Sequence, residues 1–287
     1  WIEQNKVGGG THTNKINLRD LYRVSIPLPP IAEQQRILDQ LEKVLPAIDK
    51  LSLDEKKLDE LEQAFPKKMK DAILQYAIQG KLTEQLPEDG DARDLLKEIR
   101  VEKARLVKEG KLKKENPLPE ISEDDIPFDI PENWQWMRLD DCCDISTGNS
   151  IPKHVKDSKY STKTDGLPYI ATKDVSFDNT IDYKNGIYIP FDEPNFRIAP
   201  ENSILLCVEG GSAGRKIGIT NQEVCFGNKL CKFEPVTIHP KLVFYYLQSS
   251  AFQIQFVAQM TGIIGGVGVN RIKSLPFPLS GRSPVDG

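Results

Sequence analysis

A proline-punctuated extended run that leads straight into a helix start constrains this chain more than any other feature. The run is Ile26-Pro-Leu-Pro-Pro-Ile-Ala-Glu-Gln-Gln-Arg36. Pro29 and Pro30 suit the first turn of a helix, because proline lacks the N–H that would be unpaired there. The apolar spacing that follows predicts one long helix over residues 31–80, with Gly80 as its left-handed stop.

The extended run returns in a weaker form near the other end of the chain, as Leu275-Pro-Phe-Pro-Leu279. With the same offset, Ile16–Leu21 falls opposite Val267–Ile272. Internal repetition at a fixed offset indicates repeated architecture. We therefore expect the end of one module, a long helix, and a second module that ends in the same way.

The predicted long helix carries an apolar seam, spaced by three and four residues and interrupted around residues 52–57. An apolar seam flanked by Glu, Asp and Lys is typical of a coiled-coil face. A helix of about 48 residues is roughly 70 Å long, too long to bury its seam against one compact domain. Pro46 and Pro66 should bend it. The alternative is an ordinary helix packed within one globule. The seam residues are Leu38, Leu41, Leu45, Ile48, Leu58, Leu61 and Phe65.

The rest of the chain predicts an α+β domain. Asp91 is a candidate N-cap for an exposed second helix over residues 92–109, and a charged, proline-punctuated linker follows at residues 111–129. Residues 242–260 predict a single helix that packs on a sheet. The predicted strands, separated by Gly, Pro and Asn turns, are Tyr169–Ile170, Ile187–Ile189, Ser203–Val208, Lys216–Thr220 and Leu230–Phe233.

Several segments resemble a known family. Pro27–Leu38 resembles the junction between a target recognition domain and a helix in the specificity subunit of type I restriction–modification systems. Ala77–Thr83 resembles the end of that helix, and Ile126–Trp136 resembles the start of the next recognition domain. Leu167–Asp174 and Gly210–Lys216 resemble segments inside that domain. No single motif is unique to the family, but the order and spacing of the motifs together carry the resemblance. The resemblance covers nearly the whole chain.

The resemblance implies a domain organisation. Residues 1–30 would end a first recognition domain, 31–80 would be the spacer helix, and 81–130 a second helix with its linker. Residues 131–279 would be a complete recognition domain, and residues 280–287 depart from the family pattern. The opening residues do not look like a natural start, and we expect a truncated member of the family.

The resemblance also implies a function: a non-catalytic, sequence-specific subunit that binds double-stranded DNA and reads one half of a bipartite target. Its helices would dock methyltransferase subunits, which bind S-adenosylmethionine, and through them the restriction subunit; this chain would hold no cofactor. A second copy, antiparallel along the seam, would give a homodimer. A coiled-coil adaptor with a β-rich protein-binding domain is the alternative from a different class, and a methyltransferase is a third.

The composition fits a recognition protein and offers no support for catalysis. The five cysteines show no paired metal-ligand spacing, which favours small core thiols in a reducing cytoplasm. No apolar run approaches the roughly 18 residues of a membrane span, so we expect a cytoplasmic protein without a membrane partner. The three histidines are scattered, and we find no candidate catalytic or metal-binding residues. Gly210–Lys216 lacks the spacing of a phosphate-binding loop.

The formal net charge of −4 does not indicate a nucleic-acid binder, and the lysine distribution alone favours a solvated loop, although such a loop could meet phosphates, as the family resemblance implies. A predicted loop around residues 153–163 is rich in lysine, and a glycine-rich turn ends in Arg215 and Lys216. Lysine and arginine bind phosphates and guanine, and asparagine, serine and threonine contact base edges. A solvated surface remains the alternative for each residue. The candidate DNA-binding residues are Lys153, Lys156, Lys159, Lys163, Thr172, Lys173, Ser212, Arg215, Lys216, Asn228 and Lys229.

Overall fold

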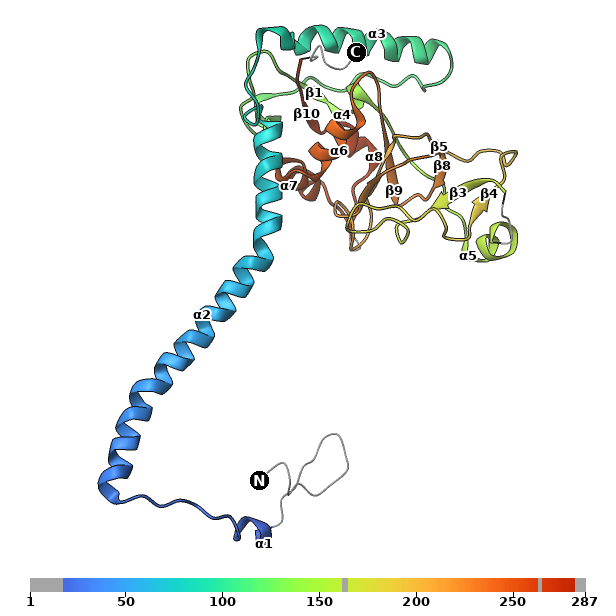
Figure 1. Cartoon of the computed structure of the whole chain (residues 1–287). Helices are drawn as coiled ribbons and strands as arrows, with labels where there is room; N and C mark the ends of the chain where they lie inside the picture. The colour runs from blue at the N-terminus through green and yellow to red at the C-terminus, as the bar shows by residue number, and fades with distance from the viewer. Residues whose placement is uncertain (1–17, 162–164, 263–264, 282–287) are drawn as a thin grey trace. The chain divides into compact units, whose positions relative to one another are not determined.

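The computed structural model describes residues 18–161, 165–262 and 265–281, and the chain divides into two compact units, Trp1–Pro66 and Lys67–Gly287. The described part of the first unit holds the short helix α1 (Leu18–Leu21), an extended run, and most of the long helix α2 (Ile31–Ile78) (Figure 1). The last turns of α2 belong to the second unit, which contains every strand in the described part of the chain.

The long helix predicted from the sequence is confirmed. It begins directly after Pro30, ends at Ile78 and continues through Pro46 and Pro66. Gly80 follows with a φ of +67°, and a Cβ atom there would lie 2.5 Å from Cγ of Pro131. Any other residue would therefore meet both backbone strain and a clash with the chain that enters the globular domain.

The internal repeat predicted from the sequence is present in the backbone. Helix α1 and helix α8 (Val269–Lys273) begin at equivalent positions of the two copies. The same turn follows each helix, because the amide of Val24 donates to the carbonyl of Leu21 and that of Leu275 to Ile272.

The two copies of the repeat differ in burial. After α8, strand β10 (Pro276–Leu279) pairs antiparallel with β1 (Gln135–Arg138), and Phe277 and Leu279 are fully buried. The equivalent side chains of the first copy, Ile26 and Leu28, are 79% and 85% exposed. The first copy thus keeps the apolar pattern of a module end.

The second unit contains three small sheets in addition to its helices. Their orders are β1-β10, β2-β9-β6-β7 and β4-β3-β8-β5; β3 and β8 are parallel, and the other pairs are antiparallel. The remaining strands are β2 (Cys143–Thr147), β3 (Leu167–Ile170), β4 (Tyr188–Ile189), β5 (Ile198–Ala199), β6 (Ile204–Cys207), β7 (Ile217–Ile219), β8 (Val224–Phe226) and β9 (Leu230–Pro235). All five predicted strands are therefore present, with bounds that differ by up to two residues.

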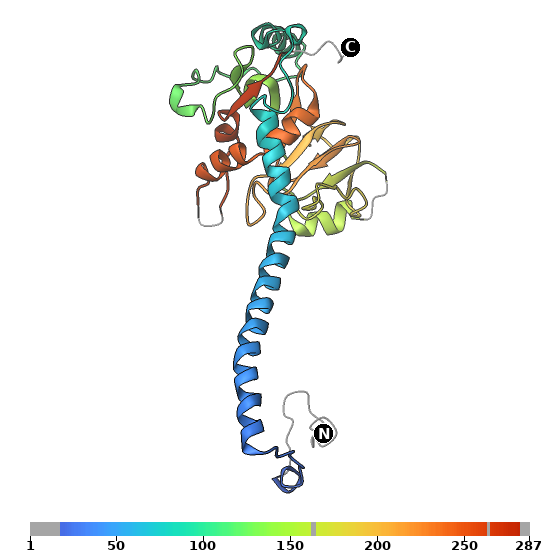
Figure 2. The ribbon, with the colours of Figure 1, turned by 60° about the vertical axis from the view of Figure 1, so that its left-hand side comes forward.

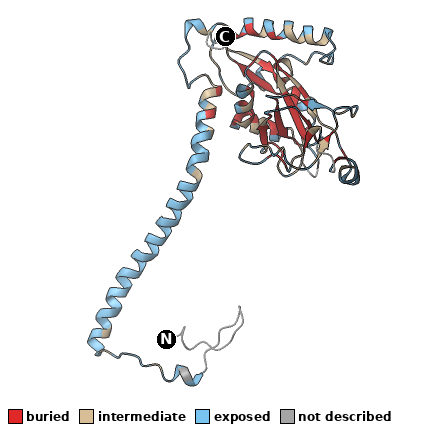
Figure 3. Ribbon diagram, turned by 45° about the vertical axis from the view of Figure 1, so that its right-hand side comes forward, coloured by how far each residue is buried: buried red, intermediate tan, exposed pale blue. Residues whose placement is uncertain are grey.

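The described part of the second unit also contains shorter helices. They are η2 (Pro87–Asp89), α3 (Ala92–Lys108), η3 (Glu123–Asp125), α4 (Leu139–Cys142), α5 (Lys153–Val155), η4 (Lys156–Tyr160), α6 (Pro240–Gln248) and α7 (Ser250–Ala258). Helix α3 lies at the end of the unit where β1 and β10 pair, and α5 lies beside β3 and β4, away from it (Figures 1 and 2). Figure 3 shows buried residues concentrated in the strands and exposed residues along most of α2.

The prediction of one helix over residues 242–260 was wrong. The chain forms α6 and α7, separated at Ser249, whose ψ of 152° is extended and not helical. The Ser249 hydroxyl accepts a hydrogen bond from the amide of Phe252 and so caps α7. Serine competes for backbone partners and favours caps over helix interiors, so a helix break at this position is physically reasonable.

Helix α3 confirms the predicted start and corrects the predicted exposure. The Asp91 carboxylate accepts a hydrogen bond of 2.7 Å from the amide of Arg93, as expected for an N-cap. However, Ala92, Leu95 and Ile99 are buried in the main hydrophobic core. These positions recur at three- and four-residue steps, a spacing that the dense charges of the other face obscured.

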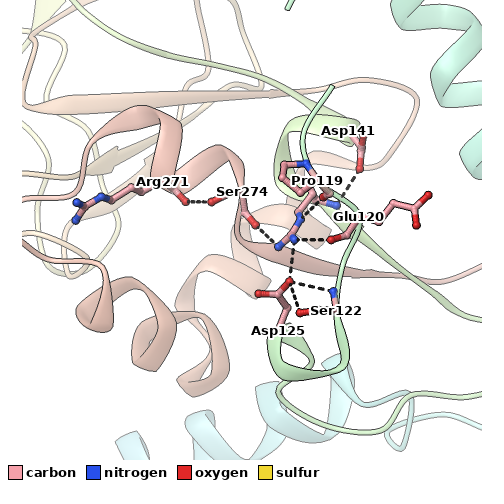
Figure 4. A network of polar contacts seen from close by, with 8 residues as sticks. Pro119, Glu120, Ser122, Asp125, Asp141, Arg271 and Ser274 are labelled. Atoms are coloured by element: carbon pink, nitrogen blue, oxygen red, sulfur yellow. Dashed lines mark hydrogen bonds and ion pairs between the residues drawn. The ribbon is translucent and has the colours of Figure 1, made fainter. Parts of the chain in front are cut away.

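The predicted linker at residues 111–129 is fastened to the domain by two buried cations. The guanidinium of Arg138 donates to the carbonyls of Pro119, Glu120 and Ser274 and to the carboxylate of Asp125, at 2.7–3.2 Å (Figure 4). Lys273, also buried, forms an ion pair with Glu115 of the same segment. The segment is therefore a strap on the domain surface.

All five cysteines are free and buried, which confirms the prediction that they are core thiols. Burial raises the pKa of Cys225 to about 11 and that of Cys231 to about 12. Both thiols are therefore protonated near neutral pH.

Candidate nucleic-acid interface

The glycine-rich segment Gly210–Lys216 forms a tight turn between the antiparallel strands β6 and β7, as the sequence predicts. The amide of Gly214 donates to the carbonyl of Cys207, and the amide of Arg215 donates to the carbonyl of Ser212. Gly214 has a φ of +75°, and a Cβ atom there would lie 2.8 Å from Oε1 of Gln253. The turn therefore rests closely on α7, and glycine is required for it.

Two of the predicted clusters meet at this turn. Nζ of Lys216 donates to the carbonyl oxygen of Thr172 at 3.0 Å, although the two residues lie 44 positions apart. Arg215 is exposed, and its guanidinium donates to the carbonyl of Gly211. Lys173 is also exposed and lies 3.9 Å from the carboxylate of Asp174.

The predicted Asn228 and Lys229 lie in the turn between β8 and β9, next to the base of the glycine-rich turn. The amide of Val208, at the end of β6, donates to the carbonyl of Lys229 at 2.9 Å. Nζ of Lys229 forms an ion pair of 3.0 Å with Glu209. Asn228 is exposed beside it. Three of the four predicted clusters are thus brought into one region of the domain.

The lysine-rich segment is not the loop that the sequence predicts. Residues 153–160 form the short helices α5 and η4, because Val155 and Tyr160 pack into a small apolar cluster with Ile151. Lys163 lies outside the described residues. A helical segment fixes the direction of its lysines more firmly than a loop would.

The described lysines of this segment have different surroundings. Lys153 is exposed, and Nζ of Lys156 lies 4.8 Å from the centre of the Tyr169 ring. Burial raises the pKa of Tyr169 to about 12, so the ring is neutral. Lys159 forms an ion pair of 2.7 Å with Glu193, and this hydrogen bond raises the pKa of Lys159.

The candidate cations differ in whether an acidic side chain lies close enough to form an ion pair. Lys159, Lys173 and Lys229 each have a carboxylate within 4 Å. Arg215 and Lys216 form no ion pair with any residue that the structure describes. Lys153 and Lys156 likewise form no ion pair among the described residues, but Arg215 and Lys216 also lie on the turn where the other predicted clusters meet. Arg215 and Lys216 are therefore the strongest candidates for binding phosphates or bases.

The sequence analysis missed Phe177, which joins this group. It lies at the end of a short hairpin over residues 174–182, and its ring centre is 5.5 Å from Cζ of Arg215 and 5.2 Å from Nζ of Lys216. The sequence offered one signal for Phe177, namely a single aromatic residue between Ser176 and Asp178 in a segment with a turn-forming asparagine. Its proximity to Arg215 depends on tertiary structure and could not be read from spacing.

The seam of α2 is exposed along its whole length. The seven seam residues, from Leu38 to Phe65, are 45–61% exposed. Large apolar side chains exposed at three- and four-residue steps in this way are typical of a packing surface. The structure confirms the helix and shows that these residues are exposed, and their pairing remains a prediction.

Two further properties concern the described residues. They contain no group of three or more His, Cys, Asp or Glu side chains arranged to hold a metal ion. None of their helices combines the length and the apolar character needed to cross a bilayer.

The chain combines a small mixed-sheet domain that carries a basic turn with a long helix that carries an apolar seam. Residues 2–63 and 131–280 match the model of the type I restriction modification DNA specificity domain. The match covers more than half of the chain, and the chain belongs to this family.

Two curated relatives are specificity subunits from Escherichia coli. The specificity subunit of type I restriction enzyme EcoAI is 36% identical over 224 residues, which are 74% of this chain and 36% of that protein. The EcoEI specificity subunit is 37% identical over 169 residues, which are 55% of this chain and 27% of that protein. The chain thus spans about a third of the length of these relatives.

Among solved structures, the chain is similar to the HsdS subunit from Thermoanaerobacter tengcongensis, with 19% identity and a TM-score of 0.46. The similarity covers 98% of this chain and 55% of that one. Family membership confirms the predicted resemblance. The structure confirms the α+β class with a long helix.

Proposed function

We propose that this chain recognises a specific sequence in double-stranded DNA and reads one half of a bipartite target. The observation that carries the proposal is the pair Arg215 and Lys216, exposed or half-buried on a tight glycine-rich turn without an acidic partner among the described residues. Such a turn lets backbone and cations approach a groove closely. Family membership and the relatives named above support the same function.

Within this proposal, residues 131–279 form the recognition domain, and Asn228 and the lysines of α5 and η4 extend the DNA-binding surface from the glycine-rich turn. Lys159, Lys173 and Lys229 would have to exchange a carboxylate for a phosphate, so each contributes less than Lys216. Residues 31–80 form the spacer helix, and residues 81–130 comprise α3 and the strap. Residues 1–30 are the end of a first recognition domain, which the burial pattern of the internal repeat supports.

The exposed seam of α2 is the proposed assembly surface. It would pair with a second helix, and the resulting helix pair would dock methyltransferase subunits that bind S-adenosylmethionine. An antiparallel second copy of this chain can supply that helix by two-fold symmetry. Such a dimer would hold two identical recognition domains apart and would therefore read a split, palindromic target.

The proposal is tested by selecting tight-binding sequences from a randomised duplex library, with and without methyltransferase subunits. Fluorescence anisotropy on the enriched duplex then compares the wild-type chain with the double variant Arg215→Ala and Lys216→Ala. Lys241→Ala is a matched control, because this exposed lysine lies at the opposite end of α6 from the turn. We expect the double variant to lose the preference for the enriched sequence and the control to keep it. A library without enrichment under both conditions would contradict the proposal.

A further inference from the structure

A solvent-exposed aromatic ring lies beside the two unpaired cations of the basic turn. Phe177 is 62% exposed, and its ring faces the guanidinium of Arg215 and the ammonium of Lys216 at 5.5 and 5.2 Å. Contacts of this kind contribute only weakly at exposed sites. That gain does not explain why a large apolar side chain is kept in water.

The hairpin that carries Phe177 is held firmly. The amide of Ser176 donates to the carbonyl of Thr180 at 2.9 Å, and Val175 pairs with Ile181. Asn179 takes the left-handed turn position, with a φ of 70°. These bonds close a tight turn whose end presents Phe177.

The domain fixes the hairpin from below. A Cβ atom on Gly218 of β7 would lie 2.6 Å from Cγ1 of Ile181, so the hairpin packs directly on the strand backbone. Nδ2 of Asn179 donates to Oε1 of Gln248, which also accepts from Lys70 of α2. The hairpin that carries the ring is thus held by contacts with α2, α6 and β7.

The polar groups near the Phe177 ring are only partly used by contacts within the domain, so a partner can bind there. The carboxylate of Asp178 accepts two hydrogen bonds from Thr180 within the turn. The hydrogen bond from Lys216 to Thr172 uses one of the three ammonium donors, and the bond from Arg215 to Gly211 uses one of five guanidinium donors. The remaining donors are available to phosphates or base edges.

We propose that Phe177 is a base-contacting residue that packs beside the base edge read by Arg215, with Lys216 on the adjacent phosphate. A rigid aromatic ring beside two cations matches the charged backbone and the thymine methyl groups that the major groove of DNA exposes. The proposal rests on the proposed DNA recognition and adds a contact that is apolar and sequence-selective.

The test compares Phe177→Ala, Phe177→Leu and Phe191→Ala in the full chain. Phe191 is the matched control, because it is 72% exposed and no cation stacks on it among the described residues. Anisotropy measures affinity for the enriched duplex at several salt concentrations, and thermal unfolding shows whether each variant is folded. Repeating the library selection with Phe177→Ala shows which base positions respond.

We expect Phe177→Ala to weaken binding about 10- to 100-fold, in the range that one mismatched base pair costs a specific complex. The preference should relax at one or two neighbouring positions, with the salt slope unchanged because no charge is removed. Phe177→Leu should keep part of the affinity, and Phe191→Ala should match the wild type.

Two outcomes would overturn the inference while DNA recognition stands: Phe177→Ala within twofold of the wild type, or equal losses for Phe177→Ala and Phe191→Ala. Either result would assign the exposed ring to another partner, such as an acidic protein surface. Failure of the wild-type chain to prefer any duplex sequence would overturn the proposed function itself, and the inference with it.

Discussion

Replacing two seam leucines by glutamate, Leu41→Glu with Leu61→Glu, tests whether α2 pairs with a second copy of itself. Both residues are on the apolar seam, at 45% and 61% exposure. The matched control is Gln40→Glu with Gln63→Glu, which adds the same charge to the same helix at exposed positions off the seam. The comparison separates loss of seam packing from added negative charge.

The size of the effect follows from the exposed fractions. Full burial of a leucine, isoleucine or phenylalanine contributes about 1.5–3 kcal/mol, so the exposed half of each seam residue represents about 1 kcal/mol. Seven residues then give about 7 kcal/mol for each helix, or about 14 kcal/mol for a two-fold pair. Association opposes this with about 4–15 kcal/mol. At the lower cost, the net gain of about 10 kcal/mol corresponds to a dissociation constant of tens of nanomolar.

The double variant changes four side chains in the pair. It removes about 4 kcal/mol of apolar burial and places four carboxylates at the contact, so the dissociation constant should rise at least about 1,000-fold. Size exclusion with light scattering at micromolar concentration should show twice the chain mass for the wild type and the control, and a monomer for the seam variant. A monomeric wild type, or a seam variant that remains dimeric, would refute this reasoning.

Three further predictions concern the recognition domain. Changing Lys153 and Lys156 to glutamate should weaken binding to all duplexes and flatten the salt dependence measured by anisotropy, since phosphate contacts release counterions; an unchanged slope would remove α5 from the interface. Arg215→Ala should relax the preference at one base position by about 1–3 kcal/mol in a competition assay if its contact is bidentate, whereas an equal loss at every position would assign Arg215 to a phosphate. The Ser122 amide and then the Arg138 guanidinium hold the pKa of Asp125 below its ordinary value of 3.8. The resulting stability is therefore present above that value and is lost as the pH falls through the lower, folded value. Asp125→Asn should make stability to urea less dependent on pH in this acidic range, and an unchanged pH profile would show that the ion pair with Arg138 does not stabilise the strap.

The elements that local rules determine were predictable. Pro30 and Gly80 fix the ends of α2, because proline suits a first helical turn and a left-handed glycine terminates the last one. Asp91 gave the start of α3 for the same kind of local reason. The internal repeat was also visible, since it requires only comparison of the chain with itself.

Features that depend on distant residues were not predictable. Glu193 neutralises Lys159 from 34 residues away, and the turn of Phe177 meets Arg215 only because the hairpin packs on β7. The break at Ser249 depends on a local choice between cap and helix interior, which the apolar spacing of residues 242–260 concealed. The residues of the candidate surface were therefore predictable from the sequence. Ranking these residues by whether they lack an ion pair required the structure.

Sequence discrimination by the glycine-rich turn is the central claim, and the ratio of two dissociation constants tests it most directly. The ratio compares the enriched duplex with a scrambled duplex of the same length and composition, at one fixed salt concentration. Specific DNA-binding proteins typically reach ratios of about 10³ or more. We expect a ratio in that range for the assembled wild-type chain and a ratio near one for Arg215→Ala with Lys216→Ala. A wild-type ratio near one would contradict DNA sequence recognition, and a full ratio in the double variant would contradict the role of this turn.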